Sequence, residues 1–269
     1  MISKNGLYAY GIVDKSPQHL DIKGIDEKNK VYPVIGEGGC VIVSEVDINQ
    51  LQSQVKQLVS ALEKTSEASQ GETEGILQAH EDVVETLMKE TTIVPFKFGT
   101  ILRDEQAATR LLQDEAERFK KLLAKFTGRA EWGLKVYADR QTLMRHIVQV
   151  EPRFRSLEEQ RQKSSKGAAY LLGRKIDEEA KERIGALIAQ VSEEIFQDLG
   201  KDAFEANLNN VLPQKVTGKN KEMILNAAYL VEGEKVADLR RRGKNFMEKY
   251  EFMGLDAEFS GPWPPYNFT

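Results

Sequence analysis

The feature that most constrains the fold is the apolar stretch at residues 223–231, which contains one strongly polar residue, Asn226. A strand with one solvent-exposed face would alternate apolar and polar side chains, and this stretch does not. It therefore predicts a central strand covered on both faces, with a buried helical turn as the alternative. Turn-forming residues 217–220 precede it, and a helical pattern follows Gly233.

Composition narrows the classes of function. The 269-residue chain has a formal net charge of −4, which argues against nucleic acid as the main partner because such proteins favour a basic face. Its single cysteine, Cys40, cannot form an internal disulfide, so we expect a cytoplasmic protein. Cys40 lies in an apolar run, which is typical of a small buried residue rather than a nucleophile. No signal peptide or run of about 20 apolar residues is visible, so we expect no lipid membrane partner.

The first part of the chain mixes strand and helix patterns. Pro95 indicates a sheet edge or an exit from the sheet within residues 91–99, where Phe96 and Phe98 are expected to point to one face. Asp47 is the expected N-cap of the first helix. The expected elements are a strand at 6–13, a hairpin at 30–35 and 40–44, helices on either side of an exposed linker at 65–75 (the second with Leu77 and His80 on its apolar stripe), a strand at 91–99, and a long helix at 104–126 that Gly128 ends.

For the second part of the chain, the sequence predicts the order strand, helices, strand, strand, helix, strand. The expected strands are 131–138, one within 207–216, 223–231 and 252–259, and a helical insertion spans about 141–199. This order predicts a ferredoxin-like βαββαβ variant, in which the first and third strands are central. Pro213, which lacks an N–H donor, agrees with an edge position for the second strand. The predicted class is α+β with two domains, 1–128 and 129–259.

The last ten residues, 260–269, differ from the rest of the chain. Prolines favour an extended path, and large aromatic rings would be costly to leave in water. We expect a tail packed between the two domains; a proline-rich ligand for a separate partner and a disordered tail are the alternatives. The residues assigned to this interdomain tail are Trp263, Pro264, Pro265, Tyr266 and Phe268.

No residue pattern indicates catalysis. His80 stands beside Glu81 and Asp82, but neighbouring helical residues point in different directions and cannot converge on one ion, so a structural histidine is favoured over a metal ligand. The basic cluster at 240–244 is interpreted as a solvated helix face, with an anion site as the alternative. No nucleophile, base and metal set converges. We therefore expect no enzyme, no metal and no cofactor.

Several segments together resemble the gas vesicle protein F/L family, accessory proteins of the gas-filled protein vesicles of buoyant microbes. The resemblance runs nearly end to end, and its ending resembles the cyanobacterial F-type form. The segments are GLYAYGIV (6–13), HE (80–81), VPFKFGT (94–100), GRAEWGLKV (128–136), AYLLGRK (169–175), LNAAYLV (225–231) and GPWPPYNF (261–268).

The resemblance implies two α+β domains, the second a ferredoxin variant with extra helices and the tail packed between them. It also implies an assembly factor or minor component that binds the gas vesicle shell protein, works with other gas vesicle accessory proteins, and stays in the cytoplasm or on the vesicle. A mean hydropathy of −0.47 excludes the water-repelling shell itself. Binding such a subunit requires an exposed apolar patch or an open strand edge. The candidates are Phe96 and Phe98, and the last strand at 252–259.

One other class of function stays open from the sequence. A ferredoxin-like domain can serve as a small-molecule regulatory or binding module. Such a module predicts a glycine-rich turn after the strand at 131–138, and Asp139, Arg140 and Gln141 stand there instead. The resemblance to gas vesicle proteins leaves two roles open, because a built-in shell component and a transient chaperone both fit the sequence.

Overall fold

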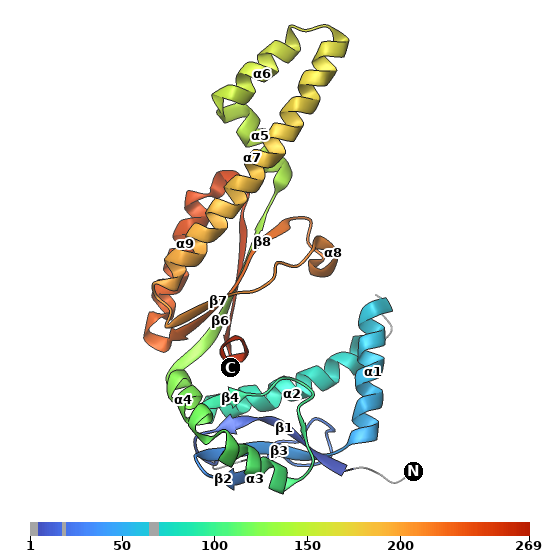
Figure 1. Ribbon diagram of the computed structural model, residues 1–269, viewed down its shortest axis with the longest axis vertical. Coiled ribbons are helices and arrows are strands. Elements are labelled where there is room, and N and C mark those ends of the chain that lie inside the picture. Colours follow the sequence, from blue (N-terminus) through green and yellow to red (C-terminus); the bar gives the residue numbers. More distant parts are fainter. Residues whose placement is uncertain (1–4, 18–19, 65–69) are drawn as a thin grey trace. The chain divides into compact units, whose positions relative to one another are not determined.

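The computed structural model describes residues 5–17, 20–64 and 70–269 (Figure 1). The chain contains helices and antiparallel strands, so the predicted mixed class of helix and sheet is confirmed. The chain divides into two compact units. The first unit comprises residues 1–130 and 263–269, and the second comprises residues 131–262.

The sheet of the first unit has the order β2-β3-β1-β4, with β5 also paired to β1. Both neighbours of the central β1 run antiparallel to it. Gly38 adopts a φ of +78° in the turn between β2 and β3, which glycine accepts without a steric penalty. The strands are β1 (Asn5–Val13), β2 (Tyr32–Gly36), β3 (Gly39–Asp47), β4 (Ile93–Pro95) and β5 (Ile101–Leu102).

Helices cover both faces of this sheet (Figure 1). The α2 helix packs its buried Val83, Val84 and Leu87 against Tyr8 and Tyr10 of β1. On the opposite face, α3 packs against β2 and β3, and α4 packs against β4. Asp47 accepts hydrogen bonds from the first turn of α1, as predicted for an N-cap. The helices are α1 (Ile48–Lys64), α2 (Gln70–Glu90), α3 (Glu105–Asp114) and α4 (Ala116–Phe126).

Three predictions for the first unit are wrong in detail. The expected single helix at 104–126 breaks at Glu115 into α3 and α4. The expected linker at 65–75 is partly helical, because α2 begins at Gln70, while 65–69 lie outside the described residues. The buried stripe of α2 begins with Ile76, which is 8% exposed, whereas Leu77 is 37% exposed.

The sheet of the second unit has the order β7-β8-β6-β9. The stretch at 223–231 forms most of β8, an interior strand with nearly every side chain buried, as its unbroken apolar sequence predicted. β6 is the other interior strand, and Leu134 and Val136 lie in the core. The strands are β6 (Arg129–Ala138), β7 (Glu205–Leu208), β8 (Glu222–Glu232) and β9 (Asp256–Trp263).

The long α7 helix supplies much of the core of the second unit. Its residues Ile184, Val191 and Ile195 are buried with Leu239 of α9 among the strand side chains. The helices are α5 (Arg140–Val150), α6 (Pro152–Gln162), α7 (Lys166–Gly200), α8 (Gln214–Thr217) and α9 (Val236–Lys249), and short 3₁₀ turns occur at Gly233–Lys235, Glu251–Met253 and, in the first unit, Tyr266–Phe268.

Two strand predictions for the second unit are corrected. Pro213 does not lie in β7 but at the N-cap of α8, so the edge position of β7 does not follow from that proline. The last strand is 256–263 instead of 252–259, because Glu251–Met253 forms a 3₁₀ turn that ends at Gly254 with a φ of +59°. The first three residues expected in the tail, together with Trp263, therefore belong to β9.

Candidate functional site

The end of the chain packs against the first unit, to which residues 263–269 belong. Phe268 is 4% exposed, and its carbonyl accepts a hydrogen bond of 3.1 Å from Nζ of Lys125. The same ammonium lies 5.6 Å from the centre of the Phe268 ring. Pro264 and Pro265 are buried, and Trp263 is 40% exposed. These contacts exclude the disordered alternative, while packing between two domains stays a prediction.

A chain of hydrogen bonds ties Tyr266 to the interior through His80. The Gly99 N–H donates to Tyr8 Oη at 2.9 Å, which leaves the Tyr8 hydroxyl proton for His80 Nδ1, also at 2.9 Å. This assignment places the imidazole proton on Nε2, which lies 3.0 Å from Tyr266 Oη. The Tyr266 hydroxyl in turn donates to Glu81 at 3.3 Å. The aromatic tail residue is thereby fixed by polar contacts as well as by burial.

The surroundings of His80 favour the structural role predicted for it. The side chain is 1% exposed, and burial lowers its pKa to about 4 despite an opposing hydrogen bond to the Phe96 backbone. Burial also raises the pKa of Glu81, with the Tyr266 hydroxyl acting in the opposite direction. Within 5–17, 20–64 and 70–269, no group of three His, Cys, Asp or Glu side chains is arranged to hold a metal ion. A neutral imidazole here serves as a hydrogen-bonding link.

Phe96 and Phe98 do not share one set of neighbours, contrary to expectation. Phe98 makes edge contacts with Tyr8 and His80, at centroid distances of 6.3 and 5.8 Å. Phe96 lies 6.4 Å from Phe119 of α4. The reason is that β4 ends at Pro95, so strand alternation no longer applies beyond it. Both side chains are half-buried.

The largest run of exposed apolar side chains that the described residues show borders β7. We call it the edge surface: Phe204, Leu208, Val211, Leu212 and Val216, whose exposed fractions range from 37% to 66%. They fall within thirteen consecutive positions, 204–216, and every residue from 210 to 216 is exposed. So many large apolar side chains exposed along one short segment of a folded protein mark it as a candidate binding surface.

The backbone of β7 is open along the same surface. β7 is the last strand of its sheet, and Asn209 N–H donates to the Asn226 carbonyl at 2.8 Å. Because backbone groups alternate in an antiparallel pair, residues 205 and 207 also face β8, while Ala206 and Leu208 direct theirs away from it. The edge surface thus combines apolar side chains with outward-facing strand donors and acceptors.

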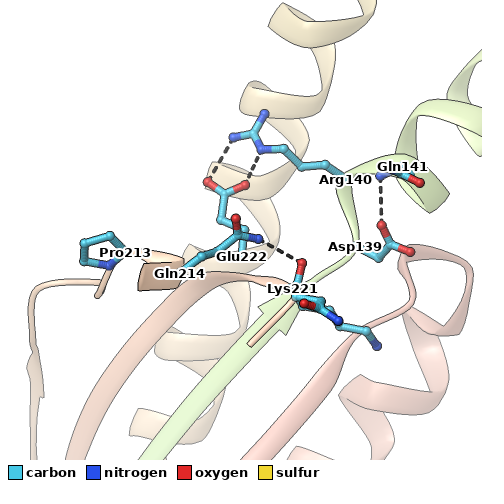
Figure 2. Close-up of a pocket in the computed structure, with 8 residues that line it drawn as sticks. Asp139, Arg140, Gln141, Pro213, Gln214, Lys221 and Glu222 are labelled. Carbon is cyan, nitrogen blue, oxygen red and sulfur yellow. Dashed lines mark hydrogen bonds and ion pairs between the residues drawn. The ribbon is translucent and has the colours of Figure 1, made fainter. Parts of the chain in front are cut away.

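A polar pocket of about 760 Å³ lies where β8 and α5 begin, and Pro213 and Gln214 of the segment 204–216 also line it (Figure 2). Figure 2 shows the Arg140 guanidinium directed at the Glu222 carboxylate, with Nη2 and Oε1 3.0 Å apart. Asp139 caps α5 through the Gln141 N–H at 2.9 Å. Lys221 binds Asp256 at 2.8 Å. The charged groups of this pocket are thus paired within the protein.

The basic cluster at 240–244 is also engaged by the protein itself. Arg240 lies 4.9 Å above the Trp132 ring. Arg241 pairs with Asp238 at 2.6 Å, and Arg242 pairs with both Asp198 and Asp202. The cluster therefore acts as a set of helix-surface ion pairs and not as a convergent anion site. Cys40 is buried and burial raises its pKa, which disfavours the reactive thiolate.

Comparisons with known proteins decide the family. The family profile described as "Gas vesicle synthesis protein GvpL/GvpF" matches residues 6–269. The chain belongs to this family. Among curated relatives, gas vesicle protein L1 of Halobacterium salinarum is 27% identical over 98% of this chain and 90% of its own length. Gas vesicle protein L of a Streptomyces species is 28% identical over 71% and 68%. Gas vesicle protein F of Microcystis aeruginosa is 25% identical over 98% of both chains.

Solved structures of this gas vesicle family share the fold. The crystal structure of the F protein from an Anabaena species superimposes with a TM-score of 0.66 at 20% identity, covering 98% of this chain and 95% of that one. The F protein of Microcystis aeruginosa gives 0.64 at 22% identity and covers 98% of both. Relatives named F and L match at similar identity, so the likeness extends to both types.

In the part of the chain that the structure describes, none of the helices combines the length and apolar character required to cross a bilayer.

The edge surface was not recognised from the sequence, although a signal was present. Leu208, Val211, Leu212 and Val216 follow a helix in a stretch rich in asparagine and lysine, with no periodic pattern that would bury them. Apolar residues outside any strand or helix period are candidates for an exposed patch. The expectation of a short strand within 207–216 concealed this signal.

Proposed function

We propose that this gas vesicle family member binds the main shell protein and supports vesicle assembly, with other gas vesicle accessory proteins as further partners. The observation that carries the proposal is the edge surface, because it offers an apolar patch and an open strand edge together. The family's description as gas vesicle synthesis proteins supplies the setting.

The chemistry of the edge surface suits an apolar subunit. A very apolar protein that is not yet assembled associates non-specifically in water unless its apolar surface is covered. An extended segment of such a protein can add to a free sheet edge through backbone hydrogen bonds while its side chains meet apolar neighbours. Leu208 provides both kinds of contact, and Val211 and Leu212 extend the apolar area.

We further propose that the protein is located in the cytoplasm and on the vesicle. It acts through contacts with other proteins alone, with no catalytic role and no cofactor. The second unit is proposed to be a ferredoxin-like βαββαβ domain with a helical insertion at about 141–199; its strand order β7-β8-β6-β9 supports that description. The alternative, a small-molecule regulatory role, is disfavoured by the pocket in Figure 2, whose Arg140 and Glu222 already neutralise each other.

The test is co-expression of the tagged chain with the shell protein, followed by measurement of the shell protein that is retained. The variant Leu208→Lys/Val211→Lys/Leu212→Lys places cations on the edge surface. We expect retention to fall at least tenfold, since each buried aliphatic side chain contributes roughly 1.5 kcal/mol or more. The matched control is Ile35→Lys/Val150→Lys, which alters side chains of similar or higher exposure, 70% and 56%, away from the edge surface.

Phe96 and Phe98 stay a second proposed contact region and enter the same assay as Phe96→Ser and Phe98→Ser. Loss of retention with an unchanged melting temperature supports contact through these rings. A lowered melting temperature with normal retention by the folded fraction assigns the rings to packing alone. Equal retention by the edge variant, its control and the unaltered chain would contradict the edge surface as the binding site.

A further inference from the structure

The helical insertion of the second unit extends past its sheet. At 1.5 Å per residue, the 35 residues of α7 span about 52 Å, whereas the 11 residues of β8 span about 36 Å. The first residue of α7 that joins the core is Ile176. We use "arm" for residues 152–175, which comprise α6, the turn after it and the start of α7. Figure 1 shows this hairpin beyond the end of the β6–β9 sheet.

The arm differs in charge from the rest of the chain. It contains seven arginine or lysine residues and two glutamates, a formal charge of +5. The whole chain is −4, so the remainder is −9. A cationic surface on an otherwise acidic protein attracts anionic partners at one place and repels them elsewhere. The positive charge of the chain is therefore concentrated on the arm.

Ion pairs hold the base of the arm, and Arg161 pairs with Glu158 within α6 at 2.6 Å, but three other cations of the arm form no ion pair among the described residues. Arg153 pairs with Glu179 at 2.9 Å, and Arg183 pairs with Glu151 at 2.7 Å. Exposed cations with no salt-bridge partner among the described residues are Arg155, Lys163 and Lys166. Because the neighbouring pairs already position α6 against α7, these three side chains are not required to hold the hairpin.

Two apolar side chains lie between cations on the exposed face of α7. Tyr170 and Leu171 are 66% and 68% exposed. Residues four apart share a helix face, so Lys166 and Arg174 flank Tyr170, and Lys175 follows Leu171 on the neighbouring row. Arg174 contacts the exposed Glu178 at 3.4 Å, and Lys175 lies 4.0 Å from the half-buried Glu179, which also pairs with Arg153. The face presents an apolar centre with a cation about 6 Å away on either side.

We propose that the arm binds an acidic amphipathic helix of a second protein partner. The fitting pattern is an apolar residue over Tyr170 and Leu171, with carboxylates one helical turn before and after it to meet Lys166 and Arg174. The observation that specifies this partner is the spacing of cation, apolar pair and cation along one helix face. With its edge surface proposed for the shell protein, the chain then connects two different partners.

The other anionic surfaces fit the arm less well. A nucleic acid would contact only the cations of the arm and leave its apolar side chains unused. The charge of −9 on the rest of the chain would also repel it. A bilayer surface takes up a helix with a broad apolar face, and the outer part of α7 offers two large apolar side chains. A protein helix is the occupant whose alternation of acidic and apolar side chains matches both features.

The test measures binding of the full chain to a fluorescein-labelled helical peptide of about 20 residues with Glu-x-x-x-Leu-x-x-x-Glu on one face, by anisotropy. We expect binding that weakens as salt is raised. Arg155→Glu/Lys163→Glu/Lys166→Glu should weaken it at least tenfold, and Tyr170→Ser/Leu171→Ser should weaken it several-fold with the cations intact. The control Lys89→Glu/Lys120→Glu/Lys121→Glu reverses three exposed lysines of the first unit and should leave binding unchanged.

Each result decides the proposal. Loss of binding in both arm variants but not in the control supports it, as does failure of a peptide with lysine in place of glutamate. No binding by the unaltered chain, or equal loss in the arm and control variants, overturns it. Tighter arm-dependent binding to phosphatidylserine vesicles or to a single-stranded DNA oligonucleotide also overturns it and assigns the arm to that surface. Far-UV circular dichroism of each variant confirms that the helices are retained.

Discussion

At the scale of single residues, the environment of a side chain decides between roles that its chemistry leaves open. His80 with Glu81 beside it is compatible with a metal ligand, an acid–base pair or a structural contact. Burial to 1% exposure and hydrogen bonds to Tyr8 and Tyr266 make it an internal link that joins β1, α2 and the chain end. A neutral imidazole suits this position because a buried cation would lack a counter-charge.

The buried histidine predicts acid sensitivity. Its folded-state pKa is about 4, below the ordinary 6.5, so the folded state binds fewer protons than the unfolded state between these values. Stability is therefore present above pH 6.5 and is lost as the pH falls toward 4. At 1.36 kcal/mol per pKa unit, the loss is roughly 3 kcal/mol. Urea unfolding of the unaltered chain and of His80→Gln across this range measures it.

The His80→Gln comparison isolates the histidine from other titrating groups. Glutamine retains a donor and an acceptor but does not titrate. Glu81, whose pKa is raised by burial, contributes stability of the opposite pH dependence and is present in both proteins. We expect the variant to have the shallower decline in unfolding free energy between pH 6.5 and 4. Parallel pH profiles would show that the histidine does not titrate as its burial requires.

At the scale of elements, the periodic patterns located most helices and strands and misplaced their ends. β4 stops at Pro95, and the Phe96 N–H makes one further bond of 2.9 Å to the Tyr10 carbonyl of β1 before the chain leaves the sheet. The break between α3 and α4 falls at Glu115, and no proline or glycine there indicates it. The start of α3 agrees with the predicted start at Asp104. In the structure Asp104 caps the helix and accepts a hydrogen bond of 2.8 Å from the Ala107 N–H.

Removal of the α3 cap should cost about 1 kcal/mol. In Asp104→Ala, the first-turn N–H groups lose their side-chain acceptor, and a penalty of about that size is typical. The Arg103–Asp104 contact of 3.5 Å adds little because it is exposed. Hydrogen exchange of the α3 amides should report the loss, and Asp104→Ser, which keeps a capping oxygen, should recover most of it. Equal exchange in the alanine and serine variants would count against the cap.

At the scale of the whole molecule, the chain forms two units, each with its own core. The first unit is discontinuous in sequence, because residues 263–269 return to it after the second unit is complete. Its last segment places Tyr266 and Phe268 among residues more than 140 positions away in the chain. Completion of the first core therefore depends on residues that follow the entire second unit.

Truncation after Pro262 should weaken the first unit selectively. Loss of the buried Phe268 alone removes roughly 2 kcal/mol or more of apolar stabilisation. Hydrogen exchange should then accelerate in β1 and α2 and stay unchanged in β8 and the core-packed part of α7. The reciprocal variant is Leu199→Ala, which removes a fully buried side chain of the second unit and should accelerate exchange there alone. Acceleration throughout both units by either change would refute independent cores.

The sequence by itself determined the elements that a local pattern specifies. Residues 223–231 became the interior strand β8 because an unbroken apolar run is stable only when both faces are covered. Asp47 and Asp104 became helix caps because a short acceptor satisfies the free N–H groups of a first turn. The segment similarities also identified the family, because many short matches in one order are specific even when each is weak.

Only the tertiary structure decided what depends on contacts between distant residues. Phe96 and Phe98 have different neighbours because β4 ends at Pro95, just before them, and a two-residue spacing in the sequence carries no information on where strand pairing stops. The exposure of Leu208, Val211 and Leu212 could not be predicted either, because an apolar residue in a sequence does not reveal whether other side chains cover it. Burial is a property of the whole packed unit, and local sequence periodicity specifies it only where an element lies against a core.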